Sequence, residues 1–156
     1  MRACDLLSPQ SILLNAKIDN RDDALGILVE LQESGGVITN GTAYYNAVFD
    51  RETAGGSTAI GEGIALPHAC NAGVAAPGLS ALTLEEGIDW GAPDGRPVDL
   101  VFMLAVPPGQ ESLRLLLLAR LVNLMSNEEL VRLLRGAQTP ADFIEKMSRI
   151  EQDVFA

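Results

Sequence analysis

Residues Val98 to Val106 form a nearly continuous apolar run that Asp99 alone interrupts. Proline precedes the run at position 97, and two prolines follow it at positions 107 and 108. A short apolar segment between such breaks is typical of a strand buried on both faces, because a strand with one solvated face alternates polar and apolar residues. The run therefore predicts a central strand in a sheet that helices cover on both sides.

Helical patterns lie on both sides of this run. Asn20 is the expected N-cap of a first helix, which Gly35 and Gly36 end. A second helix is expected after Asn40, as far as residues 51–52. The last third predicts three more helices: one over 111–125, apolar around most of its circumference and therefore deeply packed; one that Ser126 and Glu129 cap as a capping box; and one that Thr139 and Pro140 open.

Shorter strands are expected at 15–18, 59–66, 79–84 and 88–90, with a loop or a single helix turn over 69–77. The order of helices, then strands, then helices predicts an α/β fold: a single-domain sandwich with a mixed central sheet flanked by helices on both faces. No repeat or long linker divides residues 1–156, and the expected core covers about 5–150.

Charge and composition narrow the class of protein. The formal net charge is −10 over 156 residues, which argues against a nucleic-acid binder, since such a protein needs a basic face. The acidic net charge is explained either by solubility alone or by binding to a partner that has a basic docking face. Cys4 and Cys70 form no CxxC pair, and no signal peptide or membrane-spanning segment is evident, so we expect a cytoplasmic protein that does not insert into a membrane.

His68 is the only histidine, and it ends the segment Gly61-Glu62-Gly63-Ile64-Ala65-Leu66-Pro67-His68. A neutral imidazole can attack phosphorus and carry a phosphoryl group, although a lone histidine can equally be structural. A role in phosphoryl transfer is favoured over a structural one, because His68 lies at an expected strand end, and functional sites in α/β folds often lie at strand ends. Gly61 and Gly63 are expected to leave room for a phosphate or a partner's backbone.

Other chemistries lack their residues. There is no G-x-S-x-G nucleophile elbow, no Walker A sequence and no G-x-G-x-x-G. A zinc site needs about four ligands, and His68 with Cys70 supplies two. We therefore expect no metal and no other cofactor.

The segment that ends at His68 resembles the phosphorylation motif of EIIA domains of the phosphoenolpyruvate-dependent sugar phosphotransferase system, in the fructose/mannitol/nitrogen class. Further likenesses run almost from end to end, and their central strands are most like the fructose branch: Leu7-Ser8-Pro9, Arg51-Glu52 with Gly56-Ser57-Thr58, Pro77 to Ala81, Glu86 to Trp90, Ala92 to Leu100, and Leu133 to Thr139.

The resemblance implies that His68 accepts a phosphoryl group from HPr, or an HPr-like carrier, and passes it to a cysteine of an EIIB domain of a sugar permease. Arg51 would stabilise the phosphoryl oxygens, while Ser57 and Thr58 either donate hydroxyls or only shape their loop. The protein would thus be a phosphotransferase component that touches proteins and not the sugar, which is expected to be fructose-like. Cys70 is expected to be a small semi-buried residue and not an internal relay.

Two departures from the family pattern stand out. Ser112 occupies the position of the family's second histidine, and Arg51 precedes His68 by 17 residues, one more than the pattern has. Leu66, Ala69 and Val74 are the expected apolar ring on which partners dock. The alternatives are a stand-alone regulatory EIIA of the nitrogen type, whose phosphorylation state controls another protein, and a structural relative that has lost transfer.

Overall fold

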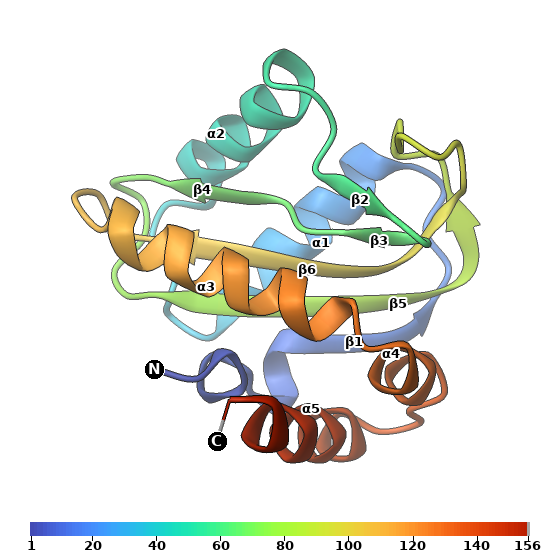
Figure 1. Ribbon diagram of the computed structural model, residues 1–156. Helices are drawn as coiled ribbons and strands as arrows, with labels where there is room; N and C mark the ends of the chain where they lie inside the picture. Colours follow the sequence, from blue (N-terminus) through green and yellow to red (C-terminus); the bar gives the residue numbers. More distant parts are fainter. Residues whose placement is uncertain (156) are drawn as a thin grey trace.

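The computed structural model describes residues 1–155, in which a mixed sheet lies between two layers of helices (Figure 1). The strand order is β1-β5-β6-β3-β2. Strand β4 pairs only with β6, further along the same edge of β6 that pairs with β3. Pairs β1–β5, β3–β6 and β4–β6 are parallel, and β2–β3 and β5–β6 are antiparallel. The strands are β1 (Ile12–Ala16), β2 (Ala59–Gly61), β3 (Ile64–Ala65), β4 (His68–Cys70), β5 (Gly78–Ile88) and β6 (Val98–Val106).

Strand β6 is the centre of the fold, and its side chains alternate between two apolar clusters. Leu100, Phe102 and Leu104 pack in the cluster that includes residues of α3, α4 and α5, while Val101 and Met103 pack with α1 and α2. The predicted sandwich is confirmed. The helices are α1 (Arg21–Ser34), α2 (Gly41–Ala54), α3 (Glu111–Met125), α4 (Glu128–Arg135) and α5 (Pro140–Val154), and the short 3₁₀ turns are η1 (Ala3–Leu6) and η2 (Pro9–Ser11).

Local capping chemistry places most helix starts where the sequence predicts them. The side chain of Asn20 accepts a hydrogen bond from the backbone N–H of Asp23 at 2.8 Å, and Thr139 caps α5 in the same way. The predicted Ser126 cap of α4 is wrong. Asn127 caps that helix at 3.0 Å from the Leu130 N–H, because Ser126 still belongs to the end of α3, where its hydroxyl donates to the carbonyl of Asn123.

The strand boundaries depart further from expectation. The segment 59–66 is a hairpin of β2 and β3 and not a single strand, since Gly61, Glu62 and Gly63 all have positive φ and turn the chain back. The strand expected at 79–84 continues to Ile88 as β5, while Asp89 and Trp90 of the strand expected at 88–90 lie outside any strand, and the expected loop over 69–77 includes the end of β4. Strand β1 spans Ile12–Ala16 and so begins three residues before the predicted 15–18; its register with β5 shifts between Leu13 and Ala16, where Asn15 has a positive φ of 53°.

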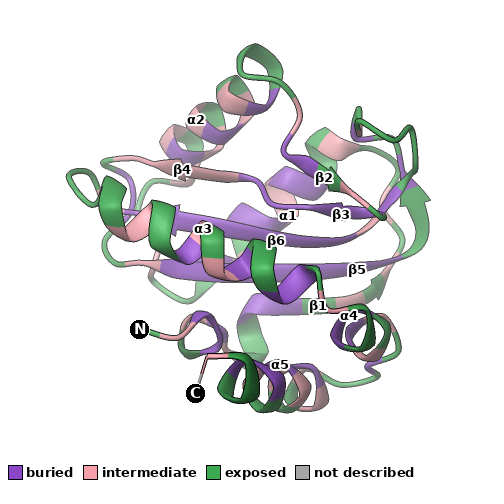
Figure 2. Cartoon of the chain, in the orientation of Figure 1, coloured by how far each residue is buried: buried purple, intermediate pink, exposed green. Residues whose placement is uncertain are grey.

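Helix α3 is buried on one side only, so the expectation that it is deeply packed is wrong. Leu117, Leu121 and Leu124 are buried against the sheet and the other helices. Leu115 and Leu116 are 59% and 56% exposed, and Figure 2 shows exposed segments alternating with intermediate and buried ones along α3. Among residues 1–155, no helix combines the length and the apolar composition that crossing a bilayer requires.

The backbone of Leu104 in β6 fixes both β4 and α2. Its N–H donates to the carbonyl of Pro67 at 3.0 Å, immediately before β4. Its carbonyl accepts a 2.7 Å hydrogen bond from the hydroxyl of Tyr44, a fully buried residue of α2. Burial raises the pKa of this tyrosine, so the hydroxyl stays protonated and able to donate.

Replacing Tyr44 with phenylalanine leaves the Leu104 carbonyl without its hydroxyl partner. We expect Tyr44→Phe to lower the free energy of unfolding by about 1–3 kcal/mol, the usual range for a buried acceptor that loses its donor. Urea denaturation measures the change. Tyr45→Phe is the matched control, because the Tyr45 hydroxyl lies at the surface and donates to the carbonyl of Asp22 at 3.3 Å. Equal losses in both variants would contradict the anchoring role of Tyr44.

Candidate functional site

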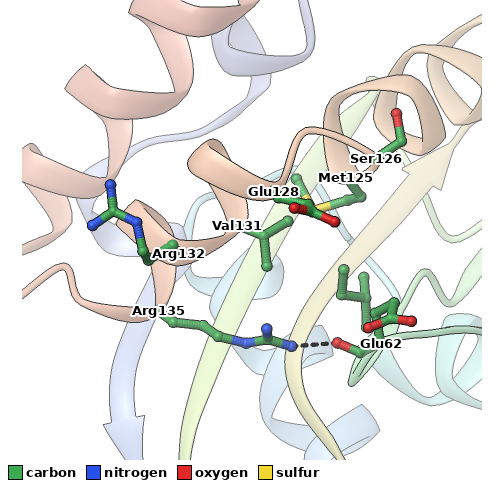
Figure 3. A pocket seen from close by; sticks show the side chains of 8 residues that line it. Glu62, Met125, Ser126, Glu128, Val131, Arg132 and Arg135 are labelled. Carbon is green, nitrogen blue, oxygen red and sulfur yellow. Dashed lines mark hydrogen bonds between the residues drawn. The ribbon is translucent and has the colours of Figure 1, made fainter.

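His68 begins β4 and lies beside Leu104 in the register of β4 with β6. The chain reaches it through the β2–β3 turn, which Arg135 of α4 holds by donating to the Glu62 carbonyl (Figure 3). A Cβ on Gly63 would lie 2.6 Å from Nη2 of that arginine. The glycines therefore serve the turn and its contact with α4, and neither lines the cavity beside His68 that they were expected to open.

Figure 3 shows the cavity of about 440 Å³ that lies between this turn and helices α3 and α4. Its lining includes Glu62, Arg132 and Arg135, and it contains neither His68 nor Arg51. The residues that were expected to carry the chemistry therefore meet elsewhere, in a smaller cavity at β4.

The imidazole of His68 is held in one tautomer. Its Nδ1 lies 2.7 Å from the carbonyl oxygen of Leu66. A carbonyl can only accept a hydrogen bond, so Nδ1 carries the proton. In the neutral ring, Nε2 then holds the lone pair, and among residues 1–155 it has no hydrogen-bond partner. The ring is therefore arranged as a nucleophile at Nε2.

Burial is the main reason that the pKa of His68 lies below its ordinary value of 6.5. The hydrogen bond to Leu66 opposes this shift, because the carbonyl stabilises the charged ring. The positive charges of Arg51 and Arg114 lower the pKa further, and Glu52 raises it. The result is an imidazole that is neutral near neutral pH.

A cavity of about 270 Å³ lies beside His68, and residues of three elements line it. They are Arg51 of α2, His68, Ala69 and Cys70 of β4, and Glu111 and Arg114 of α3. The structure thus brings Arg51 together with His68 despite the longer spacing in the sequence. Nη1 of Arg51 donates to the Gly56 carbonyl at 2.9 Å, so the lengthened loop folds back onto the arginine.

Glu52 joins this loop to the rest of the molecule. Its buried carboxylate accepts hydrogen bonds from the Thr58 backbone N–H at 2.6 Å, from the Thr58 hydroxyl, and from Nε1 of Trp90 at 3.1 Å. The Ser57 hydroxyl donates to the Trp90 carbonyl at 2.7 Å. Both hydroxyls are thus engaged in shaping the loop, which was the second of their two expected roles.

Ser112 is exposed and is not among the residues that line the cavity. Arg114, which the sequence did not single out, lines it instead. Residues three apart on a helix share a face, so Arg114 lies on the side of Glu111 and Ser112 does not. The sequence signal that could have pointed to Arg114 is its place as a basic residue in the first turn of an otherwise apolar helix. Cys70 is half-buried, as expected.

The expected docking ring is wrong in two of its three members. Leu66 and Val74 are 3% and 4% exposed, because both belong to the apolar clusters that cover the sheet. Ala69 is half-buried and lines the cavity. Among residues 1–155, no three His, Cys, Asp or Glu side chains gather closely enough to hold a metal ion.

Comparison with known proteins identifies the family. Residues 5–150 match the family described as "Phosphoenolpyruvate-dependent sugar phosphotransferase system, EIIA 2". This chain belongs to that family.

Relatives of two kinds resemble this EIIA protein. It is 33% identical to the fructose-specific EIIABC component of Bacillus subtilis over 93% of the chain, but it spans only 23% of that protein's length. It is 32% identical to a nitrogen regulatory protein of Bradyrhizobium diazoefficiens, with 88% of the chain and 89% of the relative covered. The nitrogen regulatory protein IIA-Ntr of Neisseria meningitidis has the same fold, with a TM-score of 0.85, 25% identity, and coverage of 92% of this chain and 97% of the other.

The pKa of His68 is directly measurable, because the chain has a single histidine. We expect NMR titration to give a value below 6.5 in the folded protein and a value near 6.5 in urea. Since the unfolded chain then binds a proton that the folded chain does not, this group destabilises the fold as pH falls through 6.5 toward the native pKa. A native value above 6.5 would contradict the assigned burial and tautomer.

Proposed function

We propose that this EIIA protein is a phosphocarrier in which His68 accepts a phosphoryl group from the phosphohistidine of HPr, or an HPr-like carrier, and passes it to a cysteine of an EIIB domain. The observation that carries the proposal is the hydrogen bond from Nδ1 of His68 to the Leu66 carbonyl. This bond keeps the lone pair on Nε2, while burial keeps the ring neutral.

The transfer proceeds in two balanced steps. Nε2 of His68 attacks the phosphorus of the donor, the new N–P bond forms as the donor's N–P bond breaks, and the donor imidazole leaves with its electron pair. The proton on Nδ1 stays on the ring, where the Leu66 carbonyl stabilises the positive charge that phosphorylation creates. A thiolate of the acceptor then attacks the same phosphorus; the S–P bond forms as the N–P bond breaks, and Nε2 of His68 leaves with the electron pair, which returns the ring to its neutral form.

Arg51 is the residue that we assign to the phosphoryl oxygens. Phosphoryl transfer has a loose transition state with charge spread over three oxygens, so positioning and charge stabilisation supply most of the catalysis. Arg51 lines the cavity beside His68, and the Gly56 carbonyl occupies one of its nitrogens. The other guanidinium nitrogens remain available for a bidentate contact.

The docking surface that we propose is the outer face of α3, continuous with the His68 cavity through Glu111 and Arg114. Leu115 and Leu116 are exposed apolar side chains next to these two residues. Two proteins that exchange a phosphoryl group must exclude water from it, and an apolar rim does this. The net charge of −10 would favour a donor and an acceptor with basic docking faces.

The downstream role has two candidates. A sugar role, with a fructose-like sugar and an EIIB domain of a permease in the cytoplasm, is supported by the 33% identity to the Bacillus fructose component. A regulatory role, in which the phosphorylation state of His68 controls another protein, is supported by the 32% identity to the Bradyrhizobium nitrogen regulatory protein. Transfer from phosphorylated His68 to a fructose-type EIIB distinguishes them, because only the sugar role requires it.

The first test is the mass of the intact protein after incubation with phosphoenolpyruvate, enzyme I and HPr. We expect one acid-labile phosphoryl group on the wild-type protein and none on His68→Ala, because that variant lacks the nucleophile. Arg51→Ala should slow labelling by about 100–1,000-fold, the range for removing a donor to a developing oxyanion. Absence of label with several HPr-type donors would overturn the phosphocarrier proposal.

The docking surface is tested by Leu115→Asp. We expect this variant to raise the KM for phosphorylated HPr about tenfold, because a single buried apolar contact in an interface contributes on the order of 1 kcal/mol or more. Leu13→Asp on β1 is the matched control, since Leu13 is also an exposed leucine and lies at the other side of the sheet. Equal KM values for the two variants would contradict the assignment of this face.

A further inference from the structure

Arg114 and Arg51 line the cavity beside His68 from two different helices, α3 and α2. Arg114 lies in the first turn of α3, three residues after Glu111, and both side chains line the cavity of about 270 Å³. Arg51 comes from the last turn of α2. Two helices that pack in different layers of the sandwich therefore each contribute one guanidinium to the surroundings of a single imidazole (Figure 1).

The charge of Arg114 is not neutralised by another side chain in the part of the chain that the structure describes. Arg120, the second arginine of α3, is paired with the buried carboxylate of Glu151 at 2.7 Å. The half-buried side chain of Arg114 makes no such ion pair and no hydrogen bond among residues 1–155. Arg51 is similar, since its one hydrogen-bond acceptor is the neutral carbonyl of Gly56.

Two half-buried cations beside one site repel each other and are costly to desolvate unless an anion joins them. Glu111 is the one acidic side chain in the lining, and Glu52 lies behind the loop with its carboxylate committed to Thr58 and Trp90. A dianionic phosphoryl group between the two guanidiniums compensates both charges. The site is thus complementary to the phosphorylated form of His68.

We propose that Arg114 is a second catalytic arginine, which contacts the phosphoryl group on His68 from α3 while Arg51 contacts it from α2. This inference rests on the proposed phosphocarrier function and extends it. As the donor's N–P bond breaks and the bond to Nε2 forms, negative charge spreads over three equatorial oxygens. Arg51 can contact two of them and Arg114 the third, with no proton transferred in either contact.

The proposal also accounts for the electrostatics of the ring. The groups that face His68 are Arg51 and Glu52 from α2, Glu111 and Arg114 from α3, and Cys70 from β4. Both arginines disfavour a protonated imidazole, which keeps the nucleophile neutral, and both favour a phosphorylated one. The same two positive charges therefore keep the imidazole neutral before the attack and stabilise its phosphorylated form after the attack.

The test compares Arg114→Ala and Arg114→Lys with Arg132→Ala in the HPr-dependent phosphorylation assay. Arg132 is the matched control, because it is an exposed arginine on α4, in the separate cavity that Figure 3 shows, and it has no ion pair among the described residues. We expect Arg114→Ala to lower kcat about 10–100-fold, Arg114→Lys to recover part of the loss, and Arg132→Ala to stay within about twofold of wild type.

Two further measurements separate a contact with the phosphoryl group from a role in docking or in tuning the ring. If Arg114 only helps a partner to dock, Arg114→Ala raises KM for phosphorylated HPr and leaves kcat unchanged, and the proposal is overturned. NMR titration of the single histidine should show a higher pKa in Arg114→Ala, because a nearby positive charge is gone; this measurement needs no phosphoryl transfer. A raised pKa with unchanged kcat would place Arg114 near the ring but not on the phosphoryl group, and would also overturn it.

Failure of this inference is distinguishable from failure of the phosphocarrier function. A wild-type protein that takes up no label overturns the proposed function itself. A labelled wild type with an equally fast Arg114→Ala variant overturns only the role of Arg114. Thermal unfolding of each variant identifies loss of fold, and the milder Arg114→Lys and Arg114→Gln substitutions then carry the kcat comparison.

Discussion

The backbone of Leu104 is the point on which the geometry of the site depends. Its N–H holds the carbonyl of Pro67, and its carbonyl holds the hydroxyl of Tyr44. The first contact positions the start of β4 and therefore His68. The second positions α2, whose last turn carries Arg51. Because both contacts go to a strand at the centre of the sheet, His68 and Arg51 are both positioned relative to the backbone of β6.

The site combines burial with charge in a way that suits repeated phosphorylation. Burial and two arginines keep the imidazole neutral, and the Leu66 carbonyl selects the tautomer with its lone pair on Nε2. The buried carboxylate of Glu52 is committed to Thr58 and Trp90, so it organises the loop beside Arg51 without pairing with that arginine. Positive charge therefore remains available for an incoming phosphoryl group.

Helix α3 packs one side in the core and exposes the other at the surface. Leu117, Leu121 and Leu124 fill the space above the sheet, while Leu115 and Leu116 remain exposed beside the cavity. An exposed apolar face of this kind lowers solubility unless a partner covers it, and the strongly acidic remainder of the chain offsets that cost. The same helix thus supplies a guanidinium to the lining of the cavity and the exposed apolar face that we propose for docking.

Local chemistry made much of this protein predictable from its sequence. The apolar run of β6, the caps Asn20 and Thr139, and the segment that ends at His68 each depend on residues close together in the chain, so the layered fold could be inferred and His68 could be proposed as the nucleophile. Likeness to a known family added Arg51, which periodicity alone does not reveal. The hairpin at 59–66 was missed because its turn depends on three consecutive residues with positive φ and on a contact with Arg135.

Other features depended on how distant segments pack. Leu66 and Val74 have the character of a docking rim in the sequence, yet the sheet and its helices bury both. Arg114 entered the site, and Ser112 did not, because the rotation of α3 about its axis is set by the burial of Leu117, Leu121 and Leu124. The sequence by itself determined the layers, the caps Asn20 and Thr139, and the candidate nucleophile His68, since these follow from near neighbours in the chain. Only the tertiary structure decided which charges surround that nucleophile, because side-chain orientation on a helix depends on what the opposite face must bury.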